Sequence, residues 1–82
     1  MRLIPIPGSS QIAALGYDAD QEVLVAQFQG SGGALYRYTG VPSDAFVAVI
    51  TSKESVGKAF NAHVKNKAFP YEKVDAEDVL NL

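Results

Sequence analysis

Few residues in this chain could carry out covalent chemistry. The sequence has one histidine, His63, and no cysteine, and no serine stands in a recognisable nucleophile setting. Asp18, Asp20 and Glu22 alternate like oxygen ligands for calcium, but the glycine and the distal glutamate of a calcium loop are absent. We therefore expect a protein that is not an enzyme and that holds no metal or cofactor.

Two tyrosines are the strongest candidates for binding chemistry. Tyr36 and Tyr38 flank Arg37, and in an extended strand they share one face. Exposed rings on a sheet can stack nucleic-acid bases, whereas buried rings would belong to the core with their hydroxyls hydrogen-bonded at its rim. If this strand pairs with the preceding one, both tyrosines are in phase with Leu24 and Phe28, which favours the buried alternative.

Lysines in the last third of the chain are the second candidate. Between residues 52 and 73 there are five lysines against two glutamates. On a continuous helix Lys58, Asn61 and Lys65 would form one stripe, with the two lysines about 10 Å apart along the axis. Such a stripe can neutralise phosphates, and it can equally be an ordinary solvated helix face.

Three strands and two helices are expected to position these residues. Strands are predicted over residues 9–17, 22–29 and 35–39, with a bulge near Ala13-Ala14 or Gly16. The second alternates most clearly, and the glycine-rich segment 30–33 makes the turn into the third. The predicted fold class is α+β, a three-stranded antiparallel meander (β-β-β-α-α) with both helices packed on one face.

The first helix is predicted from Pro42-Ser43 to about Thr51, and the second from Ser52 or Ser55 onward. Proline ends helical geometry at residues 69–71, so Phe69 and Tyr71 are expected to fold back as a lid on the core. The last residues, 74–82, could form a short helix or fray.

The length and composition of the chain indicate a single domain. Its 82 residues are 48% hydrophobic with a net charge of −2, enough for one core and unlike a wholly basic nucleic-acid binder. No apolar run is long enough for a bilayer, so a soluble cytoplasmic protein with no membrane partner is expected. We divide the chain into an extended arm at residues 1–8, a domain at 9–74 and an acidic tail at 75–82.

Several short motifs together resemble a known family, the KTSC domain. The motifs are Ser9-Ser10-x-Ile12, Leu15-Gly16-Tyr17-Asp18, Leu24-x-x-x-Phe28, Tyr36-x-Tyr38, Gly40-Val41-Pro42 and Ser55-x-Gly57-Lys58-x-Phe60-Asn61. The family is named for its occurrence at the C-terminus of some lysyl-tRNA synthetases, and it also exists as small single-domain bacterial proteins.

The resemblance implies a binding module with no cofactor. Its ligand would be RNA or single-stranded DNA, and the matching positions are Tyr17, Tyr36, Tyr38, Lys58, Asn61 and Lys65, with Arg37 between the tyrosines. The alternative is a protein-interaction module, either homodimeric or bound to another protein. It would use the apolar arm Leu3-Ile4-Pro5-Ile6 or an exposed sheet edge.

Overall fold

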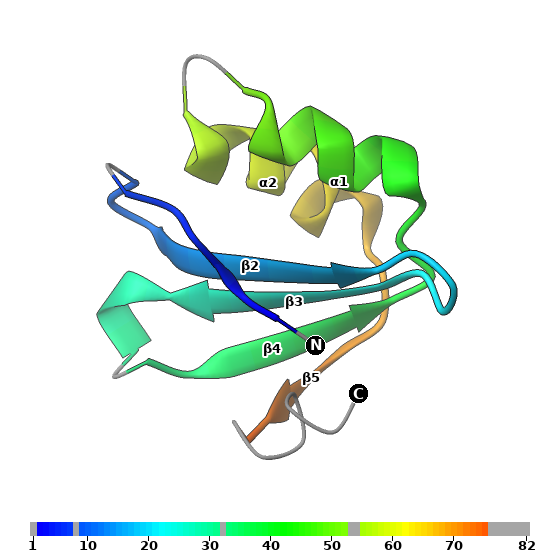
Figure 1. Ribbon diagram of the computed structural model, residues 1–82, viewed down its shortest axis with the longest axis horizontal. Helices are drawn as coiled ribbons and strands as arrows, with labels where there is room; N and C mark the ends of the chain where they lie inside the picture. The colour runs from blue at the N-terminus through cyan, green and yellow to red at the C-terminus, as the bar shows by residue number, and fades with distance from the viewer. Residues whose placement is uncertain (1, 8, 32, 53–54, 76–82) are drawn as a thin grey trace.

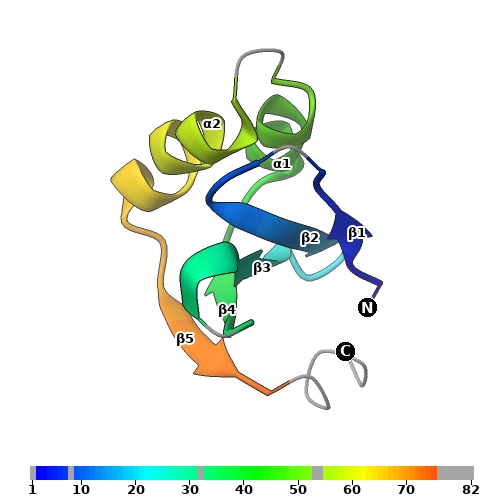
Figure 2. The same ribbon diagram turned by 90° about the vertical axis from the view of Figure 1, so that its left-hand side faces the viewer.

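The computed structural model describes residues 2–7, 9–31, 33–52 and 55–75. Five antiparallel strands form one sheet in the order β1-β2-β3-β4-β5, and two helices cover one of its faces (Figures 1 and 2). The strands are β1 (Ile4–Pro5), β2 (Ile12–Asp18), β3 (Val23–Phe28), β4 (Leu35–Thr39) and β5 (Tyr71–Val74). The helices are α1 (Ser43–Ile50) and α2 (Val56–His63). The predicted α+β class, with an antiparallel sheet and two helices, is confirmed.

The three central strands lie where the alternating pattern predicts them. β2 begins three residues later than expected, because the Ser9 hydroxyl accepts hydrogen bonds from the backbone N–H groups of Gln11 and Ile12 and holds a turn there. The register between β2 and β3 shifts between Ile12 and Ala14. This is one of the two places where the sequence allowed a bulge.

The prediction of only three strands is wrong at both edges of the sheet. At one edge, the prolines of the N-terminal segment suggested an extended arm, lying along the domain or reaching a partner, and this arm was not counted as a strand. In the structure Ile4 pairs with Leu15 and Pro5 with Ala14, and the Ile6 N–H donates to the Ala13 carbonyl. Proline is compatible with an edge strand, where it need not donate to a neighbour.

At the other edge, the segment expected to act only as a lid continues into strand β5. The Thr39 N–H donates to the Pro70 carbonyl at 2.9 Å, and Tyr71 to Val74 then pair with β4. Proline at residue 70 biases Phe69 toward extended geometry, so the chain enters β5 already extended. The helix or frayed tail considered for residues 74–82 lies, from residue 76 on, outside the described residues.

The two helices begin where predicted, but α2 is shorter than the lysine stripe requires. The Ser55 hydroxyl caps α2 by accepting from the Lys58 N–H at 3.2 Å. α2 ends at His63, and Lys65 lies in a separate 3-10 turn, η2 (Lys65–Lys67). The expectation that Lys58 and Lys65 share one continuous helix is therefore wrong, because the chain leaves helical geometry at Val64, whose φ and ψ are −121° and −62°.

The main core lies between the helices and the sheet, and a smaller cluster lies on the opposite face. Phe60, Leu24, Ile12 and Val49 are fully buried in the main core. On the outer face Val23, Val25 and Leu35 are buried, with Leu3 of the arm and Val74 of β5 packed against them. Within the described residues, no helix has the length and apolar character that a membrane span requires.

Candidate nucleic-acid interface

An aromatic hollow of about 560 Å³ opens between the sheet and the turn that follows α2. We call it the aromatic hollow and define it by its lining residues, which are Phe28, Tyr36, Tyr38, Lys65, Ala68, Phe69 and Tyr71. Its volume lies in the range of small-ligand sites. Among the described residues that line it, five are aromatic and Lys65 is the only one with a charge.

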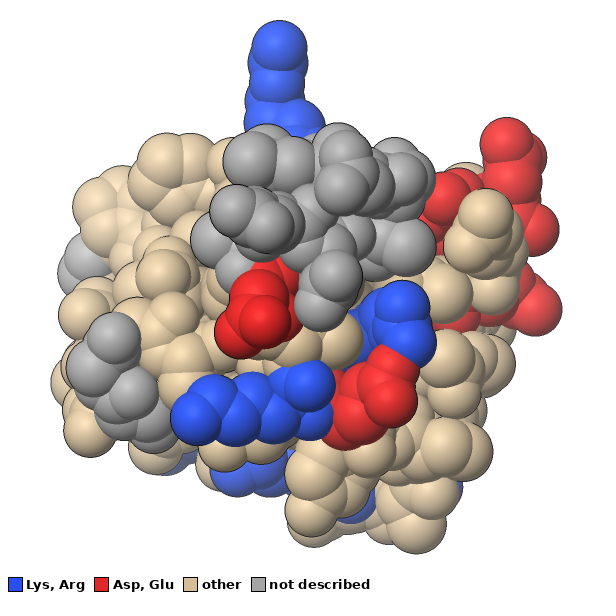
Figure 3. All heavy atoms as spheres, turned by 90° about the horizontal axis from the view of Figure 1, so that it is seen from below, with Lys and Arg blue, Asp and Glu red and all other residues tan. Residues whose placement is uncertain are grey.

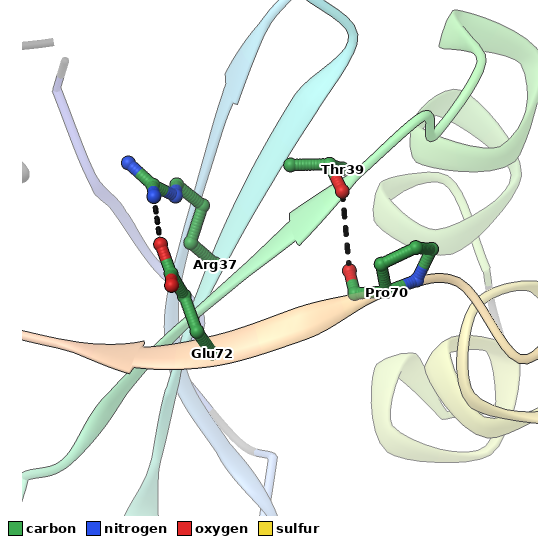
Figure 4. A network of polar contacts seen from close by, with 4 residues as sticks. All are labelled: Arg37, Thr39, Pro70 and Glu72. Atoms are coloured by element: carbon green, nitrogen blue, oxygen red, sulfur yellow. Dashed lines mark hydrogen bonds and ion pairs between the residues drawn. The ribbon is translucent and has the colours of Figure 1, made fainter.

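The pairing of β4 with β5 sorts side chains between the two faces of the sheet. Tyr38 lies opposite Tyr71 and Tyr36 opposite Lys73, so these four share the face of the hollow. Arg37 lies opposite Glu72, and the two form an ion pair on the other face (Figure 4). Because Glu72 is held there, its carboxylate is kept away from the hollow.

The rings in the hollow pack against one another and against the core below. The centroids of Tyr38 and Tyr71 are 5.3 Å apart with an interplanar angle of 29°, while Tyr36 meets Phe28 edge-on at 5.6 Å. Buried Phe60 supports both Phe28 and Tyr38 through edge contacts. Tyr71 is 65% exposed, so the hollow presents a free aromatic surface on a rigid floor.

Lys65 and the turn around it form the wall of the hollow. The Lys65 ammonium lies 5.1 Å from the centroid of the Phe28 ring, a cation–π contact. Ala68 closes η2 in the left-handed conformation, with φ +58° and ψ +37°. This conformation is uncommon for a residue with a Cβ, and here it turns the chain so that Phe69 packs onto the core.

Tyr38 is the most buried tyrosine of the hollow, and its hydroxyl is not used by the fold. Its side chain is only 4% exposed, and no described residue forms a hydrogen bond with its hydroxyl. Burial, followed by the nearby Tyr71 and Tyr36 hydroxyls, raises the pKa of Tyr38 to about 12. The group therefore stays protonated, and can donate a hydrogen bond, throughout the physiological pH range.

This pKa predicts a loss of stability in alkali. An unfolded tyrosine releases its proton near the ordinary pKa of 10.0, whereas folded Tyr38 holds it to about 12. Between these values the unfolded chain binds fewer protons, so the free energy of unfolding should fall as the pH rises, by on the order of 2–3 kcal/mol from this residue. Urea unfolding from about pH 9 to about pH 12 measures the loss. It should be smaller in Tyr38→Phe, and an equal loss in both proteins would contradict the assignment.

The structure brings together some of the residues that the sequence singled out and separates others. Tyr36, Tyr38 and Lys65 line the aromatic hollow. Lys58 is exposed and Asn61 half-buried on α2, and neither lines the hollow. Arg37 lies on the opposite face, where its Nε is buried and has no hydrogen-bond partner among the described residues.

Tyr17 lies on β2 and has a structural environment of its own. Its ring stacks on Phe46 of α1 at 4.7 Å, with an interplanar angle of 10°, and its hydroxyl donates to the Val41 carbonyl at 2.6 Å. Burial raises the pKa of this hydroxyl, and so do three nearby carboxylates, Glu22, Asp18 and Asp44. The contacts of Tyr17 tie β2 to α1 and to the segment that leads into it.

Sequence reasoning did not assign Phe28, Phe69 and Tyr71 to the site. Phe28 was expected in the core, and the other two were expected as a lid. Phe69 does pack on the core, but Tyr71 is largely exposed. The available signal was the pair of aromatics around Pro70, which marks an extended segment, although nothing local says which strand that segment joins.

Charge is distributed unevenly along the sheet. Acidic side chains gather at the end of the molecule where the β2–β3 turn lies (Figure 3), and this turn carries Asp20 and Glu22. Phe28 is the last residue of β3, five residues after Val23, which is roughly 17 Å along a strand. This exceeds the screening length of about 8 Å in physiological salt, so the turn does not set the potential at the hollow. No group of metal-ligating side chains occurs in the described part of the chain.

Comparison with known proteins identifies relatives over most of the chain. The family model of the KTSC domain matches residues 8–69. An uncharacterised protein of Stutzerimonas stutzeri is 39% identical over 67 residues, which are 82% of this chain and 90% of the relative. A protein of Tsukamurella paurometabola is 40% identical over 57 residues, which are 70% of this chain and 81% of the relative.

A solved structure shares the fold. The crystal structure of a KTSC domain protein from Yersinia pestis has a TM-score of 0.79 and 32% sequence identity to this chain. The similarity covers 90% of this chain and 97% of that one.

Proposed function

Because the chain belongs to the KTSC domain family, we propose that it is a small non-enzymatic binding module whose ligand is single-stranded nucleic acid, RNA or DNA. The observation that carries the proposal is the aromatic hollow, which is lined by five aromatic rings and one lysine. Sites that bind single strands combine rings on which bases stack with cations that neutralise the backbone. Unpaired bases, unlike those of a duplex, can leave their neighbours to enter such a hollow.

Two lysines on this face of the sheet supply the cations that the proposal requires. Lys65 contributes from η2, and Lys73 lies on the same face of β5, opposite Tyr36. A strand with one base in the hollow could place neighbouring phosphates near both ammonium groups. RNA is the favoured ligand because the family that this chain resembles is named for domains at the C-terminus of some lysyl-tRNA synthetases, which are enzymes that act on RNA. A cytoplasmic location is part of the same proposal.

The proposal predicts a modest dependence of binding on salt. If Lys65 and Lys73 each neutralise one phosphate, the logarithm of the affinity should fall with the logarithm of salt concentration at a slope of roughly −1.4, from about −0.7 per phosphate of a single strand. Lys65→Ala should weaken binding and bring the slope to roughly −0.7. Fluorescence anisotropy of labelled oligouridylate and oligothymidylate measures both quantities.

Lys58→Ala is the matched control for this experiment. Lys58 is an exposed lysine on α2 that does not line the hollow, so its replacement should leave the slope unchanged. If Lys58→Ala and Lys65→Ala changed the affinity and the salt slope equally, the nucleic acid would not bind specifically at the hollow. Absence of binding by the unmodified protein at low salt would refute the proposed function.

Exposed apolar residues on α1 favour protein interaction as the second candidate function. Val47 and Ile50 are 51% and 37% exposed, whereas the arm, one of the two partner surfaces suggested by the sequence, pairs with β2 through Ile4 and Pro5. Under this alternative, Val47→Ser would reduce the assembled mass measured by light scattering and leave nucleic-acid affinity unchanged.

A further inference from the structure

We propose that Tyr38 holds the base that enters the aromatic hollow, by donating a hydrogen bond from its hydroxyl to an acceptor on that base. The inference rests on the proposed function and deepens it, because it assigns the polar contact that fixes the ligand. It also defines the ligand as a single strand with an unpaired base.

The first argument is that the Tyr38 hydroxyl stands on a buried ring and has no hydrogen-bond partner among the described residues. Tyr38 is 4% exposed and lines the hollow, and no described residue accepts from or donates to its hydroxyl. Tyr17, by contrast, satisfies its hydroxyl through Val41. The Tyr38 hydroxyl is not among the buried polar atoms that lack a partner, so it is accessible at the hollow that Tyr38 lines, where it is free to donate a hydrogen bond to a ligand.

The second argument is that the neighbouring rings fix where this donor lies. Tyr38 stacks on Tyr71 at 5.3 Å and meets Phe60 edge-on at 5.4 Å. Phe60 is fully buried, so the Tyr38 ring cannot turn away without disturbing the core. The donor is therefore positioned before the ligand binds, which lowers the entropic cost of making the hydrogen bond.

The third argument concerns which bases this contact would accept. All bases carry acceptors on their edges, such as ring nitrogens and carbonyl oxygens. Apart from Lys65, the polar side-chain groups of the described residues lining the hollow are tyrosine hydroxyls. No amide or carboxylate is present among them to discriminate donor and acceptor patterns. The hollow should therefore accept a base with little regard to its identity.

Tyr38→Phe tests the inference without emptying the core. The variant keeps the ring contacts with Tyr71 and Phe60 and removes only the hydroxyl. We expect its affinity for labelled oligouridylate at constant salt to fall roughly three- to tenfold, as for the loss of one neutral hydrogen bond, while the salt slope is unchanged. Because Tyr38 has no internal partner, the urea midpoint at neutral pH should not fall.

A strand of the same length made of abasic sugar-phosphate units supplies the decisive comparison. The unmodified protein should bind it more weakly than oligouridylate, and Tyr38→Phe should bind it as the unmodified protein does, because there is no base to receive the hydrogen bond. Equal affinity of both proteins for oligouridylate would overturn the role of Tyr38 and leave the proposed function standing. A similar loss on both strands would also overturn it, since the hydroxyl would then serve the backbone. If the unmodified protein binds neither strand, the proposed function and this inference both fail.

Discussion

Replacement of Phe60 by alanine is expected to lower the free energy of unfolding by about 3–5 kcal/mol, the range for deleting a large buried aromatic side chain. Phe60 is fully buried and meets both Phe28 and Tyr38 edge-on. A domain of 82 residues has a total stability of roughly 4–12 kcal/mol. The substitution should therefore remove at least about a quarter of the stability and, at the lower end of this range, unfold the protein at room temperature. Urea titration followed by circular dichroism would measure the loss.

Phe60→Leu is the matched control, because it retains an apolar side chain and leaves a smaller cavity. Its loss of stability should be clearly less than that of the alanine variant. A urea midpoint close to that of the unmodified protein for Phe60→Ala would show that Phe60 does not support the floor of the hollow.

Replacement of Tyr71 by alanine is expected to give the largest loss of nucleic-acid affinity from a single change that leaves the fold intact. Stacking of a base on an aromatic ring contributes about 1–3 kcal/mol, so binding should weaken roughly 5- to 150-fold. Tyr71 is 65% exposed, so the free energy of unfolding should change by less than about 1 kcal/mol. Anisotropy titrations and urea unfolding of the same preparation separate the two effects.

Two further variants show whether the ring itself is responsible. Tyr71→Phe keeps the aromatic face and should bind nearly as well as the unmodified protein. Val47→Ala removes another exposed apolar side chain, 51% exposed on α1, and should have no effect on binding. If Tyr71→Ala binds as tightly as the unmodified protein, bases do not stack in the hollow.

Local sequence signals were sufficient for the centre of the sheet and insufficient for its edges. The alternation in residues 23–28 and the aromatic pair in β4 were enough to predict that these segments are strands and which side chains share a face. β1 and β5 have two and four residues, too few to establish a period. Their pairing depends on contacts with strands distant in the sequence, such as Ile4 with Leu15, and no local pattern encodes these contacts.

The candidate site was only partly predictable for the same reason. Tyr36 and Tyr38 stand in one strand, so their shared face follows from alternation. The hollow forms only when β5 pairs with β4 and brings Tyr71 against Tyr38. The expectation that Lys58 and Lys65 act together assumed an unbroken helix. The break at Val64 was not evident from propensity, because valine is less favourable than alanine in a helix but does not by itself end one.

The register between β4 and β5 also bears on the behaviour of the protein at high concentration. β5 is an edge strand of the described sheet, and such an edge can pair with its own copy in a second molecule. In an antiparallel pair of copies related by a twofold axis, directly opposite residues lie on the same face. Two such registers pair three of the four residues of β5 with the second copy. In one of them Glu72 lies opposite Glu72 of the second copy, and in the other Lys73 lies opposite Lys73.

Like charges directly opposite one another destabilise a strand pair. The alternating charges of β5 thus oppose edge-to-edge aggregation, which an exposed strand would otherwise invite. The Glu72 side chain is more than half exposed even within its ion pair with Arg37, so its charge remains open to an approaching copy on the outer face of the sheet. Lys73 presents its charge on the face that carries the hollow. This charge pattern allows a short edge strand to carry an exposed tyrosine at the rim of the aromatic hollow without favouring pairing between copies.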